Sequence, residues 1–132
     1  MKIVKAAMKP LLTSFIFMLV VALLAGCAAV SKPKTLAFSD VKVVSDPAAP
    51  VAGQLAKLIV QVNNPAYAER EAEVQLQINH IQALPQLIDA SREGETYVAE
   101  YVFPQAGTYQ VTMHLEYEEE HYAYANPIEV GG

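Results

Sequence analysis

Hydrophobic and polar residues alternate along most of the chain that follows residue 36. Successive side chains of a β-strand point to opposite faces, so this alternation predicts strands with one buried face. The clearest examples are the segments 55–62, 73–80 and 108–117. In the last of these, the residues that the pattern places in a core are Tyr109, Val111, Met113, Leu115 and Tyr117.

Three further segments, 36–44, 96–103 and 121–130, are also predicted to be strands. Pro127 interrupts the last one and favours an edge position, because proline has no backbone N–H to give to a neighbouring strand. Around Pro85 we expect a short irregular piece instead of a strand. The apolar side chains expected to pack on the core there are Leu84, Leu87 and Ile88.

Turn residues separate these segments, and the chain after residue 36 shows no convincing amphipathic helix. Gly107 lies just before one strand and is expected to adopt a backbone conformation that other residues resist. These six segments and the irregular piece near Pro85 make seven short segments, which predict an all-β fold, an immunoglobulin-like β-sandwich of about seven strands. We expect this domain to occupy residues 36–132.

The beginning of the chain has a different composition. Lys2, Lys5 and Lys9 precede an apolar run at 11–25, which is shorter than the ~20 residues that span a bilayer as a helix. A basic start, a short apolar core and small residues at the end are typical of a secretory signal. Residues 1–26 are therefore predicted to be a signal peptide that precedes the sandwich.

The signal ends in Leu24-Ala25-Gly26-Cys27, which resembles the lipobox of bacterial lipoproteins. The resemblance implies that diacylglycerol is attached to the thiol of Cys27 and that the peptide is cut before this residue. Two acyl chains are enough for stable anchoring, so residues 27–35 become a lipidated tether on the outer face of the cell membrane. The alternative is a cysteine that lies by chance beside an ordinary signal.

Charge and cysteine content restrict the partners of the expected mature chain, residues 27–132. Six Lys+Arg and fourteen Asp+Glu give a formal charge of 6 − 14 = −8, which disfavours nucleic acid as a partner. Cys27 is the only cysteine, so lipidation leaves no disulfide and no cysteine nucleophile. Common hydrolase, phosphate-loop and dinucleotide motifs are absent from the sequence, and we expect that the protein is not an enzyme.

Candidate chemistry is concentrated in the stretch HLEYEEEH. Leu115 and Tyr122 are both expected in the core, and pairing them places His114, Glu116 and His121 on one outward face. Two imidazoles and a carboxylate suit Zn(II) or Cu(II). The alternative is a solvated sheet face whose glutamate-rich tip prevents aggregation.

This register requires an even number of residues in the connection between the two strands. A four-residue loop at 117–120 is favoured over a two-residue turn at Glu118–Glu119, because such turns usually need Asn-Gly or a similar pair with positive φ. His80 is expected to be a half-buried residue at the core edge. At ~3.4 Å per strand residue it lies about 20 Å from the histidine pair, too far to be a third ligand.

From about residue 40 to its end, the chain resembles the YtkA-like domain family, which is related to the FixH-like group. The residues that carry the family pattern are Gly94, Tyr97, Phe103, Gly107, Tyr109, His114 and His121. The resemblance implies a small extracytoplasmic β-sandwich and copper handling related to envelope or cytochrome oxidase assembly. Where relatives carry Met-His-x-Met-Pro, this chain has EHYAYANP, which lacks the thioether ligands that favour Cu(I).

These features together predict a membrane-anchored, extracytoplasmic binding module. Its ligand is expected to be a copper or zinc ion, and its lipid partner is the membrane that holds the acyl anchor. The alternative function is a cell-envelope protein–protein interaction module that binds no metal and uses its exposed sheet face or its loops.

Overall fold

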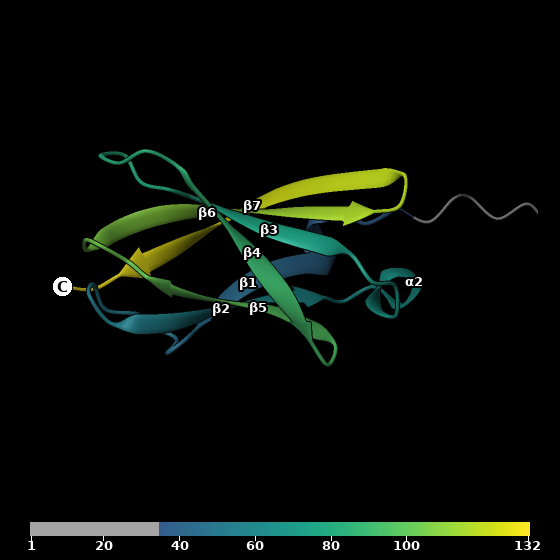
Figure 1. Ribbon diagram of the computed structural model, residues 1–132, viewed down its shortest axis with the longest axis horizontal. Helices are drawn as coiled ribbons and strands as arrows, with labels where there is room; N and C mark the ends of the chain where they lie inside the picture. Colours follow the sequence, from purple (N-terminus) through teal and green to yellow (C-terminus); the bar gives the residue numbers. More distant parts are fainter. Residues whose placement is uncertain (1–34) are drawn as a thin grey trace, which may run out of the picture. The chain divides into compact units, whose positions relative to one another are not determined.

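Seven antiparallel strands account for most of residues 35–132, the part of the chain that the computed structural model describes (Figure 1). The strands are β1 Val41–Asp46, β2 Leu55–Val62, β3 Glu73–Asn79, β4 Gln86–Glu93, β5 Thr96–Val102, β6 Gly107–Tyr117 and β7 Glu120–Val130. The predicted signal peptide, the lipobox Leu24-Ala25-Gly26, Cys27 and the tether up to residue 34 lie outside the described residues.

The strands form one continuous sheet in the order β1-β2-β5-β4-β3-β6-β7. β4 changes partner along its length, since residues 86–90 pair with β3 and residues 91–93 pair with β5. The sheet thereby folds into two layers, β1-β2-β5 and β3-β6-β7 (Figure 1). At the open edge, the backbone N–H of Val43 donates to the Asn126 Oδ1 at 3.1 Å, so the sheet is nearly closed. The predicted all-β, immunoglobulin-like sandwich is confirmed.

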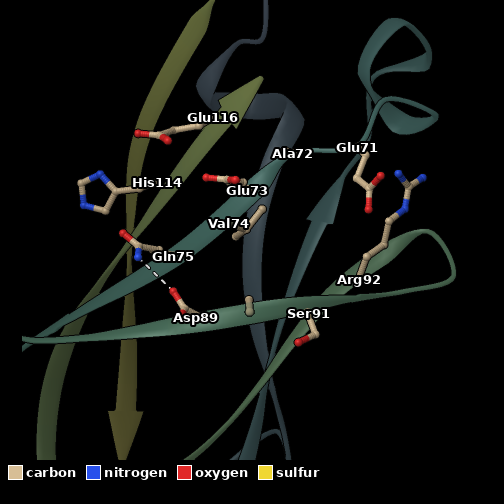
Figure 2. A pocket seen from close by; sticks show the side chains of 11 residues that line it. Glu71, Ala72, Glu73, Val74, Gln75, Asp89, Ser91, Arg92, His114 and Glu116 are labelled. Atoms are coloured by element: carbon tan, nitrogen blue, oxygen red, sulfur yellow. Dashed lines mark hydrogen bonds between the residues drawn. The ribbon is translucent and has the colours of Figure 1, made fainter. Parts of the chain in front are cut away.

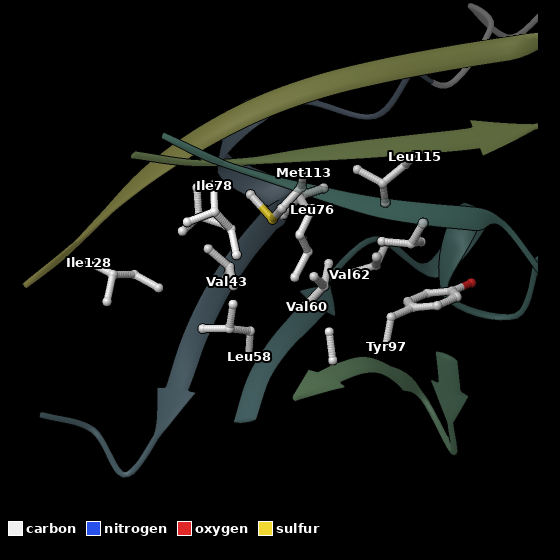
Figure 3. Close-up of a cluster of buried hydrophobic side chains, with 14 of the residues drawn as sticks. Val43, Leu58, Val60, Val62, Leu76, Ile78, Tyr97, Met113, Leu115 and Ile128 are labelled. Carbon is white, nitrogen blue, oxygen red and sulfur yellow. The ribbon is translucent and has the colours of Figure 1, made fainter. Parts of the chain in front are cut away.

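The core lies between the two layers and follows the alternation in the sequence. All five residues of β6 that were predicted to point inward are buried, with no more than 1% of their surface exposed. Side chains from the facing strands complete this core, as Figure 3 shows for Val43, Leu58, Val60, Leu76 and Ile128. Thr35–Gly132 is a compact unit that contains its own hydrophobic core, as an independently folding domain requires.

Two sequence predictions about the secondary structure were wrong. The segment 36–44 is not one strand, because the turn η1 Phe38–Asp40 precedes β1 and is closed by the Asp40 carboxylate, which accepts the Ala37 N–H at 2.9 Å. The irregular piece near Pro85 is largely the strand β4. Leu84 and Leu87 do not pack on the core, since they are 87% and 57% exposed.

The loop after β2 contains a single helical turn, α2 Pro65–Ala68. Asn64 caps it by accepting the Ala66 N–H at 2.9 Å, as asparagine commonly does at a helix start. No helix among the described residues is long and apolar enough to cross a bilayer.

Gly107 opens β6 with φ of 135°, a backbone conformation that favours glycine, as the sequence predicted. A Cβ at this position would lie 3.0 Å from the Nε2 of His80. The glycine therefore allows the imidazole to pack closely against the start of β6.

Leu115→Ala tests which of the alternating residues of β6 point into the core. Leu115 is fully buried, so the change is expected to lower the free energy of unfolding by about 2–5 kcal/mol. Thr112 points to the outer face between Gln77 and Ala125, and Thr112→Ala is expected to cost less than about 0.5 kcal/mol. Urea unfolding of residues 35–132 measures both values. Equal losses of stability in the two variants would contradict the assignment of Leu115 to the core and Thr112 to the outer face.

Candidate functional site

The predicted register between β6 and β7 is confirmed. Leu115 lies opposite Tyr122, Glu116 opposite His121, and His114 opposite Ala123. His114, Glu116 and His121 therefore share the outward face of these two strands. The imidazole rings of His114 and His121 are stacked, with their centroids 5.7 Å apart and their planes 11° from parallel.

The connection between the strands differs from the one that the sequence favoured. Tyr117 pairs with Glu120, so the turn consists of the two residues Glu118 and Glu119 instead of the four residues 117–120. Glu118 has φ of 25°, in a region that residues with a Cβ adopt at some cost. Because both connections contain an even number of residues, the same side chains face outward in either case.

Interactions beneath the turn explain why this pair of glutamates can form it. Four residues, here called the turn clamp, join α2 and the second residue after it to the start of β7: Tyr67, Arg70, Glu120 and Tyr122. Arg70 Nη1 lies 2.9 Å from Glu120 Oε2, and the Tyr67 hydroxyl donates to Glu120 Oε1 at 2.9 Å. The Tyr122 hydroxyl donates to the same oxygen at 3.2 Å. Glu120 is thus held at the first position of β7, which keeps the turn short.

The turn clamp also changes the electrostatics of Glu120. The hydrogen bond from Tyr67, followed by that from Arg70, holds the pKa of the Glu120 carboxyl below its ordinary value. The Arg70 guanidinium also lies over the rings of Tyr67 and Tyr117, at 4.8 and 4.9 Å from their centroids. Glu120 is therefore a structural anchor, a role that the local sequence does not indicate because Tyr67 and Arg70 lie about fifty residues away.

A shallow groove of about 560 Å³ runs beside His114 and Glu116, across β3 and β4 (Figure 2). Its acidic lining residues are Glu71, Glu73, Asp89 and Glu116. Glu73 of β3 lies directly opposite Glu116 of β6, and like charges in this arrangement repel each other. Glu73 is not among the site residues predicted from the sequence, although its outward position in the alternating segment 73–80 was a usable signal.

Hydrogen bonding orients one of the two imidazoles. His114 Nε2 lies 3.1 Å from the Gln77 Oε1, while the Gln77 amide nitrogen donates to Asn79. A carbonyl oxygen only accepts, so the Nε2 of His114 carries the proton and the Nδ1 of the neutral ring has a free lone pair. Metal-binding histidines commonly donate their second ring N–H in this way.

The donors do not form a complete metal site as they stand. Within residues 35–132, no group of three or more His, Cys, Asp or Glu side chains is arranged to hold a metal ion. An imidazole donates in the plane of its ring, so one ring must rotate out of the stack before both can bind one ion. A third donor requires rotation of Glu116 or Glu73, both of which have exposed side chains. The residue types fit Zn(II) or Cu(II).

His80 lies at the other end of β6 from this surface. Its ring packs 4.6 Å from that of Tyr109, and its Nδ1 accepts the Gln82 N–H at 3.3 Å. It is half-buried beside Gly107, in agreement with its predicted place at the core edge. His80 is therefore too distant to take part in a site with His114 and His121.

Comparison of the chain with known protein families, with curated proteins and with solved structures found no match.

Tyr117→Phe tests the packing beneath the turn. The Tyr117 hydroxyl is buried and has no hydrogen-bond partner among the described residues. Leaving a buried hydroxyl unsatisfied costs free energy, so its removal is expected to stabilise the domain by about 1 kcal/mol at pH 7. Urea unfolding measures the change. A loss of stability would show that the hydroxyl has a stabilising partner.

The same variant has an expected pH signature. Burial raises the pKa of Tyr117 from 10.0 to about 12. Between these values the unfolded chain binds fewer protons than the folded one, so stability is unaffected below pH 10 and falls as the pH rises through this window. Tyr117→Phe is expected to lose less stability between pH 9 and pH 12 than the wild type. If the stability of the two proteins depended on pH in the same way, Tyr117 would be excluded as a source of the stability lost at alkaline pH.

Proposed function

We propose that the protein is a membrane-anchored, extracytoplasmic module that binds a copper or zinc ion on the outward face of β6 and β7. The observation that carries the proposal is the stacked pair of His114 and His121, 5.7 Å apart, with Glu116 opposite His121. The resemblance to the YtkA-like family favours copper among the metals that such donors suit.

The surroundings of the pair support a cation as ligand. Glu71, Glu73 and Asp89 line the adjacent groove, and a surface with one sign of charge raises the local concentration of ions of the opposite sign. An ion between Glu73 and Glu116 also offsets the repulsion of these facing carboxylates. The Gln77 carbonyl keeps the Nδ1 of His114 free to act as a ligand.

The available donors favour Cu(II) or Zn(II) over Cu(I). Met113 is the one methionine in residues 35–132, and it is fully buried in the core. The surface therefore offers imidazole nitrogens and carboxylate oxygens without thioether sulfur, and these ligands suit the divalent ions. Because Glu116 and His121 are exposed, the ion remains open to exchange with a second molecule, as metal handling requires.

The alternative function is a cell-envelope protein–protein interaction module that binds no metal. The observation that favours it is the presence of large exposed aliphatic side chains on the connection between β3 and β4, where Ile81 is 94% and Leu84 is 87% exposed. Exposed apolar groups of this size mark interaction surfaces when they cluster.

Metal titration of residues 35–132 tests the proposed site. Cu(II) and Zn(II) are expected to bind saturably, and His114→Ala and His121→Ala are each expected to lose most of the affinity. His80→Ala is the matched control and should lose almost none, because His80 lies at the far end of β6. Binding should weaken below about pH 6, where protons compete for imidazoles with a reference pKa of ~6.5.

Isothermal titration calorimetry gives the affinity of each variant, and circular dichroism verifies that each is folded. Absence of saturable binding below roughly millimolar metal, where the binding free energy falls to about −4 kcal/mol, would refute the metal site. A loss of metal affinity in His80→Ala equal to that in His114→Ala and His121→Ala would refute the location of the metal site.

Cys27→Ser tests the proposed anchor. Without the thiol, diacylglycerol has no attachment point, so the variant is expected to be released from the membrane or to remain as an uncleaved precursor. Fractionation of cells followed by mass spectrometry of the intact protein measures both outcomes. A processed protein of unchanged mass that still sediments with membranes would contradict lipidation at Cys27.

A further inference from the structure

Charge is segregated between the two ends of the described domain. Residues 35–132 carry four Lys+Arg and fourteen Asp+Glu, a formal charge of 4 − 14 = −10. The connections at one end, 63–72, 94–95 and 118–119, contain five glutamates and one arginine. The connections at the other end, 47–54, 80–85 and 103–106, contain no Asp, Glu, Lys or Arg (Figure 1). The first end is thus strongly acidic. The second, here called the neutral end, has uncharged connections, and the charged residues at its strand ends are Asp46, which pairs with Lys57, and Glu129.

The neutral end presents large aliphatic side chains to solvent. On the β3–β4 hairpin, Ile81, Leu84 and Leu87 are 94%, 87% and 57% exposed. The ten residues 79–88 contain no Asp, Glu, Lys or Arg. No charged side chain in this segment therefore interrupts the exposed apolar surface. Exposed apolar surface of this kind is the usual mark of an interaction site.

Local hydrogen bonds hold the hairpin in this exposed conformation. The Ala83 N–H donates to the His80 carbonyl at 3.1 Å, and the Gln82 N–H donates to the His80 Nδ1 at 3.3 Å. On the opposite arm, the Tyr101 hydroxyl donates to Gln86 Oε1 at 3.3 Å. The His80 ring is itself packed on Tyr109. The aliphatic groups are therefore presented by an ordered turn, which lowers the entropy lost when a partner binds.

Amide side chains are frequent in the connections at this end of the domain and in the strand residues next to them. They belong to Gln54, Asn79, Gln82, Gln86, Gln105 and Gln110. An apolar centre with an uncharged, hydrogen-bonding rim is the anatomy of a protein–protein contact. Loops that enter a bilayer generally carry tryptophan, lysine or arginine, and residues 79–88 contain none of these. The composition therefore favours a protein partner over lipid.

From this arrangement we infer that the β3–β4 hairpin, residues 80–87, is a self-association surface whose occupant is the same hairpin of a second copy. Two copies of a domain with charge −10 repel each other in most orientations. A head-to-head approach brings together the neutral ends and leaves the acidic ends at the greatest separation. Ile81, Leu84 and Leu87 then pack on their symmetry mates, as in a two-fold contact.

This contact is independent of the proposed metal site, because His114 and His121 lie toward the acidic end of β6 and β7. The hairpin is small, so the association is weak and depends on protein concentration. Raising the salt concentration screens the remaining repulsion between the two acidic domains without weakening an apolar contact. Self-association is therefore stronger at high salt, whereas pairing through opposite charges would be weaker.

Sedimentation velocity of residues 35–132 tests the inference, at concentrations from about 10 µM to about 1 mM, where weak small-area contacts associate. Chelator is present throughout, so that metal-bridged pairs do not form. The sedimentation coefficient is expected to rise with concentration, and more steeply at high salt. Ile81→Gln combined with Leu84→Gln should raise the dissociation constant at least tenfold. The matched control, Leu55→Gln combined with Val102→Gln, changes an exposed aliphatic pair on the other layer and should leave it unchanged.

Spin labels locate the contact, since residues 35–132 contain no cysteine. A label at Gln105→Cys, beside the neutral end, should give a defined distance between copies, while a label at Glu119→Cys should give none in the measurable range.

Absence of concentration dependence, or an equal effect of the two double variants, would overturn the inference. Binding of the monomer to phosphatidylcholine vesicles that is lost in Ile81→Gln/Leu84→Gln would assign the hairpin to lipid and also overturn it.

Discussion

The register between β6 and β7 is the constraint on which the rest of the outward surface depends. Successive side chains of a strand alternate between faces, so a slip of one residue would turn His121 inward while His114 stayed outside. The pairing of Leu115 with Tyr122 prevents this slip, because both side chains gain from packing against the core. The turn clamp holds the same register from the end of the hairpin, through Glu120. Apolar packing in the core and the polar contacts of Glu120 thus stabilise the same alignment of the two strands.

Much of this alignment could be predicted from local sequence, whereas the turn could not. The alternation of β6 identifies its buried face, and the two strands lie next to each other in the chain. The choice between a two-residue and a four-residue connection depends on Tyr67 and Arg70, which lie about fifty residues earlier. A local rule about turn residues therefore favoured the longer loop, and the tertiary contacts overrode that preference.

Strand β4 shows a second limit of pattern analysis. Its inward positions include Ala90 and Arg92, and its outward positions include Leu87, so its sequence lacks a clean apolar alternation. Expecting Leu84 and Leu87 in the core followed from their hydrophobicity alone. The structure leaves them exposed because β4 pairs in register with β3 and places Leu87 beside Gln77 on the outer face. Glu73 was overlooked for a related reason, since its importance comes from Glu116 across a pairing of distant segments.

The division of β4 between two partners has a consequence for how the domain opens. Its first part is hydrogen-bonded to one layer and its last residues to the other, so the layers are not separate cooperative units. Neither layer can peel away without breaking the backbone hydrogen bonds of a strand that the other layer also uses. Amide hydrogens on both parts of β4 are therefore expected to exchange with solvent through the same large opening event, so that the sandwich opens as one foldon.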